Sequence, residues 1–174
     1  MIDHFARLGM TKAFHIDEAE LESKYLALSR ACHPDFNQHL SADQQRDNLA
    51  NAAALNESYA IVRDPFRRAE HLLMSVGGPS AATQKEMPAD FLEEMLELRM
   101  TIAEMEANPQ AHHEKEALRK QLENRRDSLV NEAGQLLESF QNGGGPQRLN
   151  HVRRLLNSVK YVAGLLNDLD SPIF

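Results

Sequence analysis

The chain has one cysteine, Cys32, and no tryptophan among its 174 residues. A lone thiol has no partner for an internal disulfide and no second thiol with which to share a metal ion. His112 and His113 are adjacent, so on a helix they point in different directions and are not expected to bind a metal together. This composition is typical of a reducing compartment, and we expect a cytoplasmic protein with no metal or other cofactor.

Long apolar runs are also missing. No segment approaches the roughly 18 consecutive apolar residues of a membrane helix. The amino-terminal stretch MIDHFARLGM lacks the pattern of a signal peptide, so we expect neither a membrane span nor export. The net charge of −7 at pH 7 repels polyanions, and nucleic acid is therefore not an expected partner.

What the chain does contain is helical periodicity. Apolar residues recur at spacings of three and four, without sustained alternation, and this pattern predicts an all-α fold. Asp17 followed by Glu20 resembles a capping box. A helix of about four turns is expected from there to the break that Pro34 imposes. One face of this helix carries Leu21, Tyr25, Leu28 and Cys32.

A second long helix is expected after the loop, with Ser41 as its N-cap. Its apolar face consists of Ala52, Leu55, Tyr59 and Val62. The two helices would form an antiparallel hairpin, with a short helix near residues 5–8 at one end. Another helix would open with Asp64 as its cap and Pro65 at its first position. These elements predict a first domain over residues 1–75.

A change of composition follows the first domain. The stretch SVGGPSAATQKEMPAD, residues 75–90, has glycines, prolines and little periodicity, and it predicts a linker over 76–88. Beyond it, helical patterns run over 89–107, 111–140 and 147–169. They predict a three-helix bundle with antiparallel neighbours, which forms a second domain over residues 89–174.

The pattern over 89–107 contains more apolar residues than one seam requires. The seam itself, at the four and three spacings of bundle packing, consists of Phe91, Met95, Leu98, Ile102 and Met105. A second apolar stripe consists of Leu92, Leu96 and Met100, with Glu93, Glu97 and Glu104 beside it. Either the helix buries a broad face, or the second stripe binds a partner. Our hypothesis is the partner site.

The last helical pattern has a similar surplus of apolar residues. Its seam consists of Leu149, Val152, Leu156, Val159 and Ala163. We expect Tyr161 and Leu165 to point largely away from this seam and to join the same outer patch.

The helix break at His33, Pro34 and Asp35 has three interpretations. Cys32 beside His33 suggests a thiol nucleophile and its base, although neighbours in sequence rarely face each other. In a structural interpretation, His33 interacts electrostatically with the C-terminal end of the preceding helix, and Asp35 forms part of a turn. In the third, the turn is a docking point whose charged groups bind an arginine-bearing partner. The tripeptide alone does not decide among them.

The setting of the tripeptide resembles a J-domain, in which a His-Pro-Asp loop joins two antiparallel helices with a shorter helix on either side. Three ranges are more similar to the HscB branch of iron–sulfur cluster co-chaperones than to general J-proteins: residues 5–9, 21–35 and 56–73, the last with RDPFRRAEHLL. In the second domain, DFLEEMLELRMTIAEME resembles the HscB helix that bears the scaffold-binding surface, and VKYVAGLLNDL resembles the last HscB helix. The resemblance covers nearly the whole chain.

This resemblance implies a co-chaperone with no chemistry of its own. It would bind the iron–sulfur scaffold protein IscU through the bundle and stimulate ATP hydrolysis by the DnaK-type chaperone HscA. The implied chaperone contacts are His33, Pro34 and Asp35, assisted by Lys24 and Arg30 of the preceding helix. The implied scaffold contacts are Leu92, Leu96, Glu97, Met100, Glu104 and Tyr161.

Some positions depart from the family pattern. Phe36 stands where many J-domains have a lysine, which would weaken electrostatic docking. Glu93 and Met100 stand where the family has an apolar and an acidic residue, so the patch is redistributed. Lys24 and Arg30 also suit the helix dipole by their position alone. The amino-terminal metal-binding segment of eukaryotic relatives is absent, which favours a bacterial protein.

Two other classes of protein stay open. One is a J-domain protein that delivers a different client through the same bundle. Co-purification distinguishes the two: the HscB-type co-chaperone would co-purify with IscU, and the other protein with a different client. The other is a thiol enzyme built on Cys32.

Replacement of Cys32 by serine separates the thiol enzyme from the co-chaperone. We expect the Cys32→Ser variant to stimulate the chaperone's ATPase as the wild type does, because the resemblance assigns the sulfur no contact. A steady-state ATPase assay measures this. The thiol-enzyme hypothesis instead predicts that Cys32→Ser abolishes activity, so complete loss of the stimulation would contradict the co-chaperone interpretation.

Overall fold

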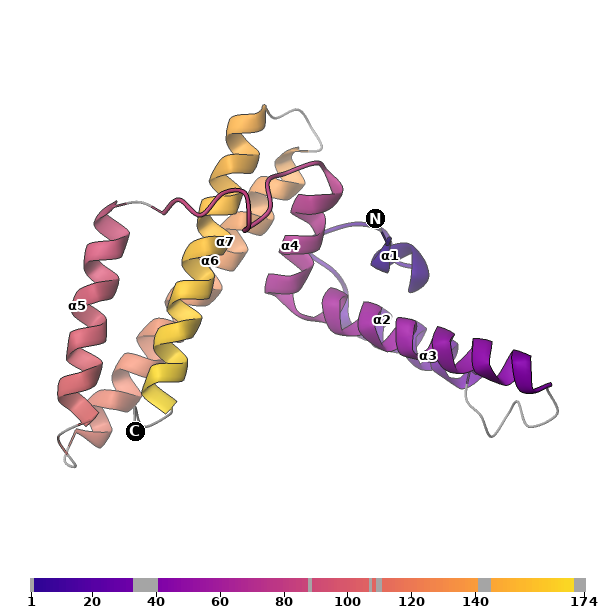
Figure 1. Cartoon of the computed structure of the whole chain (residues 1–174), viewed down its shortest axis with the longest axis horizontal. Helices are drawn as coiled ribbons and strands as arrows, with labels where there is room; N and C mark the ends of the chain where they lie inside the picture. Colours follow the sequence, from indigo (N-terminus) through magenta and orange to yellow (C-terminus); the bar gives the residue numbers. More distant parts are fainter. Residues whose placement is uncertain are drawn as a thin grey trace. The chain divides into compact units, whose positions relative to one another are not determined.

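The computed structural model describes residues 2–32, 41–87, 89–106, 108, 111–140 and 145–170. Within these ranges the regular elements are all helices, which confirms the predicted all-α fold. They are α1 (His4–Arg7), α2 (Glu18–Cys32), α3 (Ala42–Arg63), α4 (Pro65–Ser75), α5 (Ala89–Glu106), α6 (His112–Phe140) and α7 (Pro146–Asp170) (Figure 1). The chain forms two compact units, Met1–Ser75 and Val76–Phe174.

Asp17 starts α2 by accepting hydrogen bonds from free backbone amides of the first turn. Its Oδ1 accepts from the amide of Ala19 at 2.9 Å and from that of Glu20 at 3.2 Å. The Glu20 carboxylate does not complete the predicted capping box, because it lies 2.7 Å from the ammonium of Lys24 instead. Only the Asp17 half of the capping box is therefore present, and Glu20 forms an ion pair with the residue one turn further along the helix.

The starts of α3 and α4 follow the sequence signals. Ser41 and Gln44 exchange side-chain to backbone hydrogen bonds and form a capping box at the start of α3. Pro65 is the first residue of α4, and the Asp64 carboxylate accepts from the amide of Arg67 at 2.8 Å. Both predicted caps are confirmed.

The first unit is built on a pair of helices, α2 and α3, which lie side by side and run in opposite directions (Figure 1). The Tyr25 hydroxyl donates to the Asn56 side chain at 2.9 Å, and its ring stacks on that of Tyr59 with centroids 4.0 Å apart. The apolar face of α2 is buried only in part. Leu21 is 1% exposed, whereas Leu28 is 37% exposed.

Arg68 links α4 to the end of α3 from inside the first unit. Its guanidinium donates to the carbonyl of Val62 at 2.6 Å and to that of Arg63 at 3.4 Å, and it lies 5.2 Å from the ring centre of Phe14. The side chain therefore satisfies carbonyls that the last turn of a helix leaves free. Burial lowers the pKa of Arg68 from its usual value, and the guanidinium stays charged at neutral pH.

The second unit contains α5, α6 and α7, and α7 packs against both of the others. An ion pair joins Arg119 to Asp170, and the Glu132 carboxylate lies 3.5 Å from Nε2 of His151, so α6 and α7 run in opposite directions. The connection before α5 is fastened to α7 as well, because the Asn157 amide donates to the carbonyl of Gln84 at 3.0 Å. Four residues of the predicted α7 seam are buried: Leu149, Val152, Leu156 and Val159.

The prediction that Leu165 points away from the core is wrong. Leu165 is 0% exposed. A single seam was expected along α7, but a helix packed against two neighbours buries most of its circumference. Tyr161, from the same prediction, is half-buried rather than outward-facing.

Replacement of Leu165 by alanine tests this correction. We expect the free energy of unfolding to fall by about 2 to 5 kcal/mol, because a fully buried leucine leaves a cavity. Urea unfolding followed by far-UV circular dichroism measures it. The matched control is Asn167→Ala, at an exposed position of the same helix, for which a change within about 0.5 kcal/mol is expected. A similarly small effect for Leu165→Ala would contradict the burial.

Candidate partner-binding surfaces

His33, Pro34, Asp35 and Phe36 lie outside the residues that the structure describes. What is described are the helix ends on either side. The preceding helix, α2, ends at Cys32, and Ser41 caps α3. The loop role assigned to the tripeptide therefore stays a prediction.

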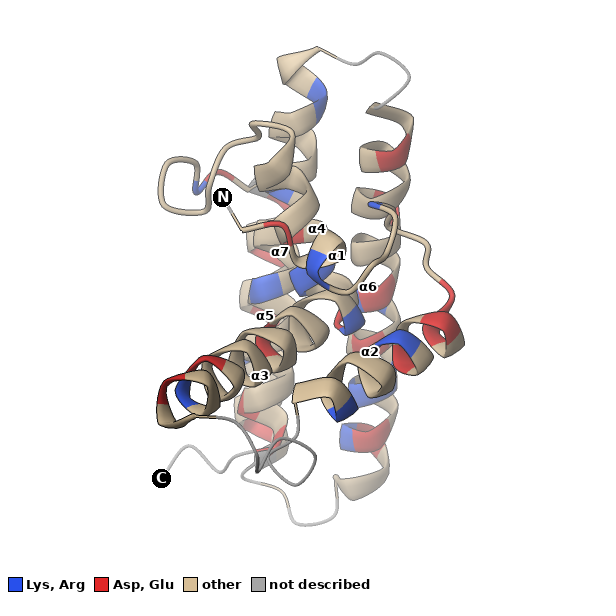
Figure 2. Ribbon diagram, turned by 90° about the vertical axis from the view of Figure 1, so that its right-hand side faces the viewer, with Lys and Arg blue, Asp and Glu red and all other residues tan. Residues whose placement is uncertain are grey.

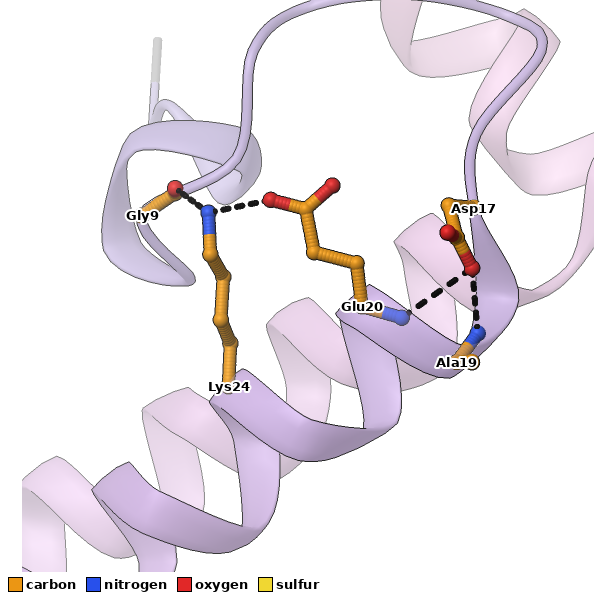
Figure 3. Close-up of polar contacts among 5 residues, drawn as sticks. All are labelled: Gly9, Asp17, Ala19, Glu20 and Lys24. Atoms are coloured by element: carbon orange, nitrogen blue, oxygen red, sulfur yellow. Dashed lines mark hydrogen bonds and ion pairs between the residues drawn. The ribbon is translucent and has the colours of Figure 1, made fainter.

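Lys24 is engaged within the first unit. Its ammonium donates to the backbone carbonyl of Gly9 at 2.6 Å and pairs with the Glu20 carboxylate at 2.7 Å (Figure 3). The segment that follows α1 is thereby fastened to α2. Gly9 suits this turn because its φ of 65° is a left-handed conformation that side chains disfavour. The ammonium would have to leave or share these two partners in order to bind a chaperone.

Arg30 lies in the last turn of α2 and is exposed. A cation at this end of a helix interacts favourably with the helix dipole. Figure 2 shows that basic and acidic residues both occur along α2, so its surface is of mixed charge rather than uniformly basic. Of the two predicted basic contacts, Arg30 is the more accessible.

The apolar residues of α5 divide between two faces, as the spacing indicates. Met95 is 0% exposed, and the seam residues Phe91 and Ile102 are also buried. The exposed fractions are 39% for Leu92, 57% for Leu96 and 56% for Met100. We call these three exposed residues the α5 stripe. At about 100° per residue they lie within one narrow sector of the helix surface, so the stripe is continuous.

Acidic side chains border the α5 stripe. Glu93, Glu97 and Glu104 are all exposed. By the same angles the three glutamates lie on one side of the α5 stripe, so the surface fits a partner that is apolar at its centre and basic along one side.

Tyr161 contacts α5 rather than standing free. Its ring meets that of Phe91 edge to face, with centroids 6.3 Å apart, and the guanidinium carbon of Arg99 lies 5.7 Å from its centre. Arg99 also donates from Nε and Nη2 to one carboxylate oxygen of Asp168, at 3.1 and 2.9 Å. Sequence reasoning did not find Arg99 or Asp168, because nothing local to either residue indicates that they meet.

Within the described part of the chain, no group of three or more His, Cys, Asp or Glu side chains is arranged to hold a metal ion. His112 and His113 are both exposed. Among the described helices, none has the length and apolar composition needed to cross a membrane.

Comparisons with known proteins cover both units. A family model described as the HSCB C-terminal oligomerisation domain matches residues 87–170. The co-chaperone protein HscB homolog of Azoarcus sp. is 31% identical over 98% of this chain and 93% of its own. Chaperone HscB from Vibrio cholerae has a similar fold, with a TM-score of 0.80 at 22% identity over 97% of this chain and 96% of its own. Human co-chaperone HscB has a TM-score of 0.77 at 20% identity over 98% of this chain and 81% of its own.

Removal of the apolar side chains of the stripe is expected to leave stability almost unchanged. Because Leu92 and Leu96 are exposed, each alanine replacement should alter the free energy of unfolding by no more than about 0.5 kcal/mol. Met95→Ala, on the buried face of the same helix, is the matched control and should cost about 2 to 5 kcal/mol. Urea titration of the three proteins gives these values. A Leu92→Ala/Leu96→Ala variant that unfolds far below the wild type would show that the stripe belongs to the core.

Proposed function

The chain belongs to the HscB family of co-chaperones, and from this we propose that it delivers the iron–sulfur scaffold protein IscU to the DnaK-type chaperone HscA. As a co-chaperone it is not an enzyme. In this proposal the second unit binds the scaffold and the His33-Pro34-Asp35 loop of the first unit stimulates ATP hydrolysis by the chaperone.

The observation that carries the scaffold role is the α5 stripe. Leu96 and Met100 are more than half exposed on a helix whose opposite face is buried in the bundle. Singly exposed apolar residues are common on protein surfaces, but three in one sector with an acidic border are typical of a binding site. Such a patch suits an apolar segment of the scaffold with basic residues along one side, and Glu97 and Glu104 would pair with those basic residues.

Tyr161 would contribute one edge of the scaffold site. This α7 residue is half-buried, and its ring contacts Phe91 and Arg99 of α5. A rigidly held aromatic ring binds with a low entropic cost, because few of its rotamers are lost on association. We therefore propose that Tyr161 extends the apolar surface laterally from the stripe.

The chaperone role rests on the family and on the loop sequence. In the proposal Asp35 accepts a charge-assisted hydrogen bond from an arginine of the chaperone, while His33 and Pro34 shape the turn. Arg30, which is exposed, would contact an acidic patch on the same partner. Lys24 would contribute less, since its ammonium already binds Gly9 and Glu20.

A pair of variants separates the two halves of the proposal. Asp35→Asn keeps the size of the side chain and removes its charge, so we expect it to lose stimulation of HscA and to keep wild-type affinity for IscU. Leu92→Ala/Leu96→Ala should do the reverse. Its affinity for IscU should fall by at least about 30-fold, the effect of losing one hot-spot side chain, while stimulation measured without IscU stays at the wild-type level.

Steady-state ATPase assays and isothermal titration calorimetry measure these two quantities on the full chain. Unchanged stimulation by Asp35→Asn would refute the loop contact. Wild-type IscU affinity in the double alanine variant would refute the stripe. If the wild type stimulates HscA but does not bind IscU, the chain delivers a different client. Sedimentation of both proteins serves as a control for any change in self-association.

A further inference from the structure

One polar contact joins α5 to α7 directly beside the α5 stripe. Nε and Nη2 of Arg99 both donate to one carboxylate oxygen of Asp168, and the guanidinium carbon lies 5.7 Å from the ring centre of Tyr161. We call these three residues the α5–α7 clasp. Phe91, on α5, meets the same tyrosine ring edge to face, with centroids 6.3 Å apart.

Arg99 occupies the border between the exposed and the buried faces of α5. It follows Leu92 by seven residues, which places the two within about 20° of each other around the helix axis. It follows Met95 by four residues, at about 40°. The side chain therefore leaves α5 at the edge of the stripe that faces α7, and its length lets it reach Asp168.

The other contacts of α5 set which of its faces is buried. The buried seam consists of Phe91, Met95 and Ile102. The flexible side chain of Met95 adapts to small rotations of the helix. Apolar burial is also non-directional. The ion pair between Glu94 and Arg125 of α6 is long, at 3.8 Å, and about half exposed on both sides. A guanidinium held by a carboxylate and an aromatic ring, by contrast, has a defined direction.

We propose that Arg99 is a positioning residue for partner binding. Burial of the seam turns the stripe outward, and Arg99, by holding Asp168 and Tyr161, limits the remaining rotation of α5 about its axis. This inference rests on the proposed function of the stripe. It differs from a direct role of Arg99 in binding, because the residue acts through α7 and its partner carboxylate is also required.

Two single variants and their combination test the proposal. Arg99→Gln and Asp168→Asn each break the clasp, so each should weaken binding of IscU by about threefold at low salt, as suits a partly exposed ion pair. The double variant should be no weaker than either single one, because both remove the same contact. The charge exchange Arg99→Asp/Asp168→Arg should recover only part of the lost affinity, because it restores the ion pair but not the guanidinium beside the Tyr161 ring. Arg119→Gln is the matched control, since it breaks an ion pair between α6 and α7 that does not touch α5.

Deuterium uptake by the backbone amides of α5 gives a second readout that needs no partner. Arg99→Gln and Asp168→Asn should both raise uptake over residues 93–104 in the free chain, and Arg119→Gln should not. If affinity falls in Arg99→Gln alone and uptake is unchanged, Arg99 contacts the partner directly and the positioning role is overturned. Unchanged uptake and affinity in both variants overturns it as well. Uptake that rises in Arg99→Gln and Asp168→Asn would show that the clasp orders α5. If the Leu92→Ala/Leu96→Ala variant nevertheless binds IscU with wild-type affinity, the proposed function of the stripe is refuted.

Discussion

Burial of α7 is the constraint on which the arrangement of the second unit depends. The helix packs against α6 and α5 and buries residues around most of its circumference, including Leu165 and Val162. Each large apolar side chain removed from water contributes about 1.5 to 3 kcal/mol, so this packing dominates the energetics of the unit. Because the seam of α5 packs against α7, the other side of α5 faces solvent. The exposure of the α5 stripe is thus a consequence of where α7 lies.

The sequence allowed correct prediction of the features that are local. Helix starts at Ser41 and Pro65 follow from hydrogen bonds within four residues, and the exposure of Leu96 follows from its angle relative to Met95. Contacts between distant residues left no such signal. Arg99 and Asp168 are separated by 69 positions, and Lys24 reaches Gly9 across 15. Leu165 was misassigned because periodicity identifies one seam, whereas the number of neighbouring helices is a tertiary property.

The proposed function fits the size and chemistry of this surface. A delivery protein must release its client, and a strip of three apolar side chains with an acidic rim supports moderate affinity with fast dissociation better than a large interface would. Glu97 and Glu104 would raise the association rate and select for basic partners. Arg99 lies 5.7 Å from the ring centre of Tyr161, and in the proposal these two residues would hold the edge of the α5 stripe, so that little conformational entropy would be lost on binding. In the first unit, the contacts of Lys24 order the segment beside α2, while Arg30 stays accessible.

Site-specific photo-crosslinking to IscU is the most direct measurement of the proposed contact. A photoreactive amino acid at position 96 places the probe in the middle of the stripe, and the same probe at Gln121, which is exposed on α6, serves as the reference. If α5 is the docking helix, position 96 crosslinks to the scaffold, excess unlabelled chain competes the product away, and position 121 gives none. Equal yields at the two positions, or a product at 121 alone, would contradict docking on the stripe.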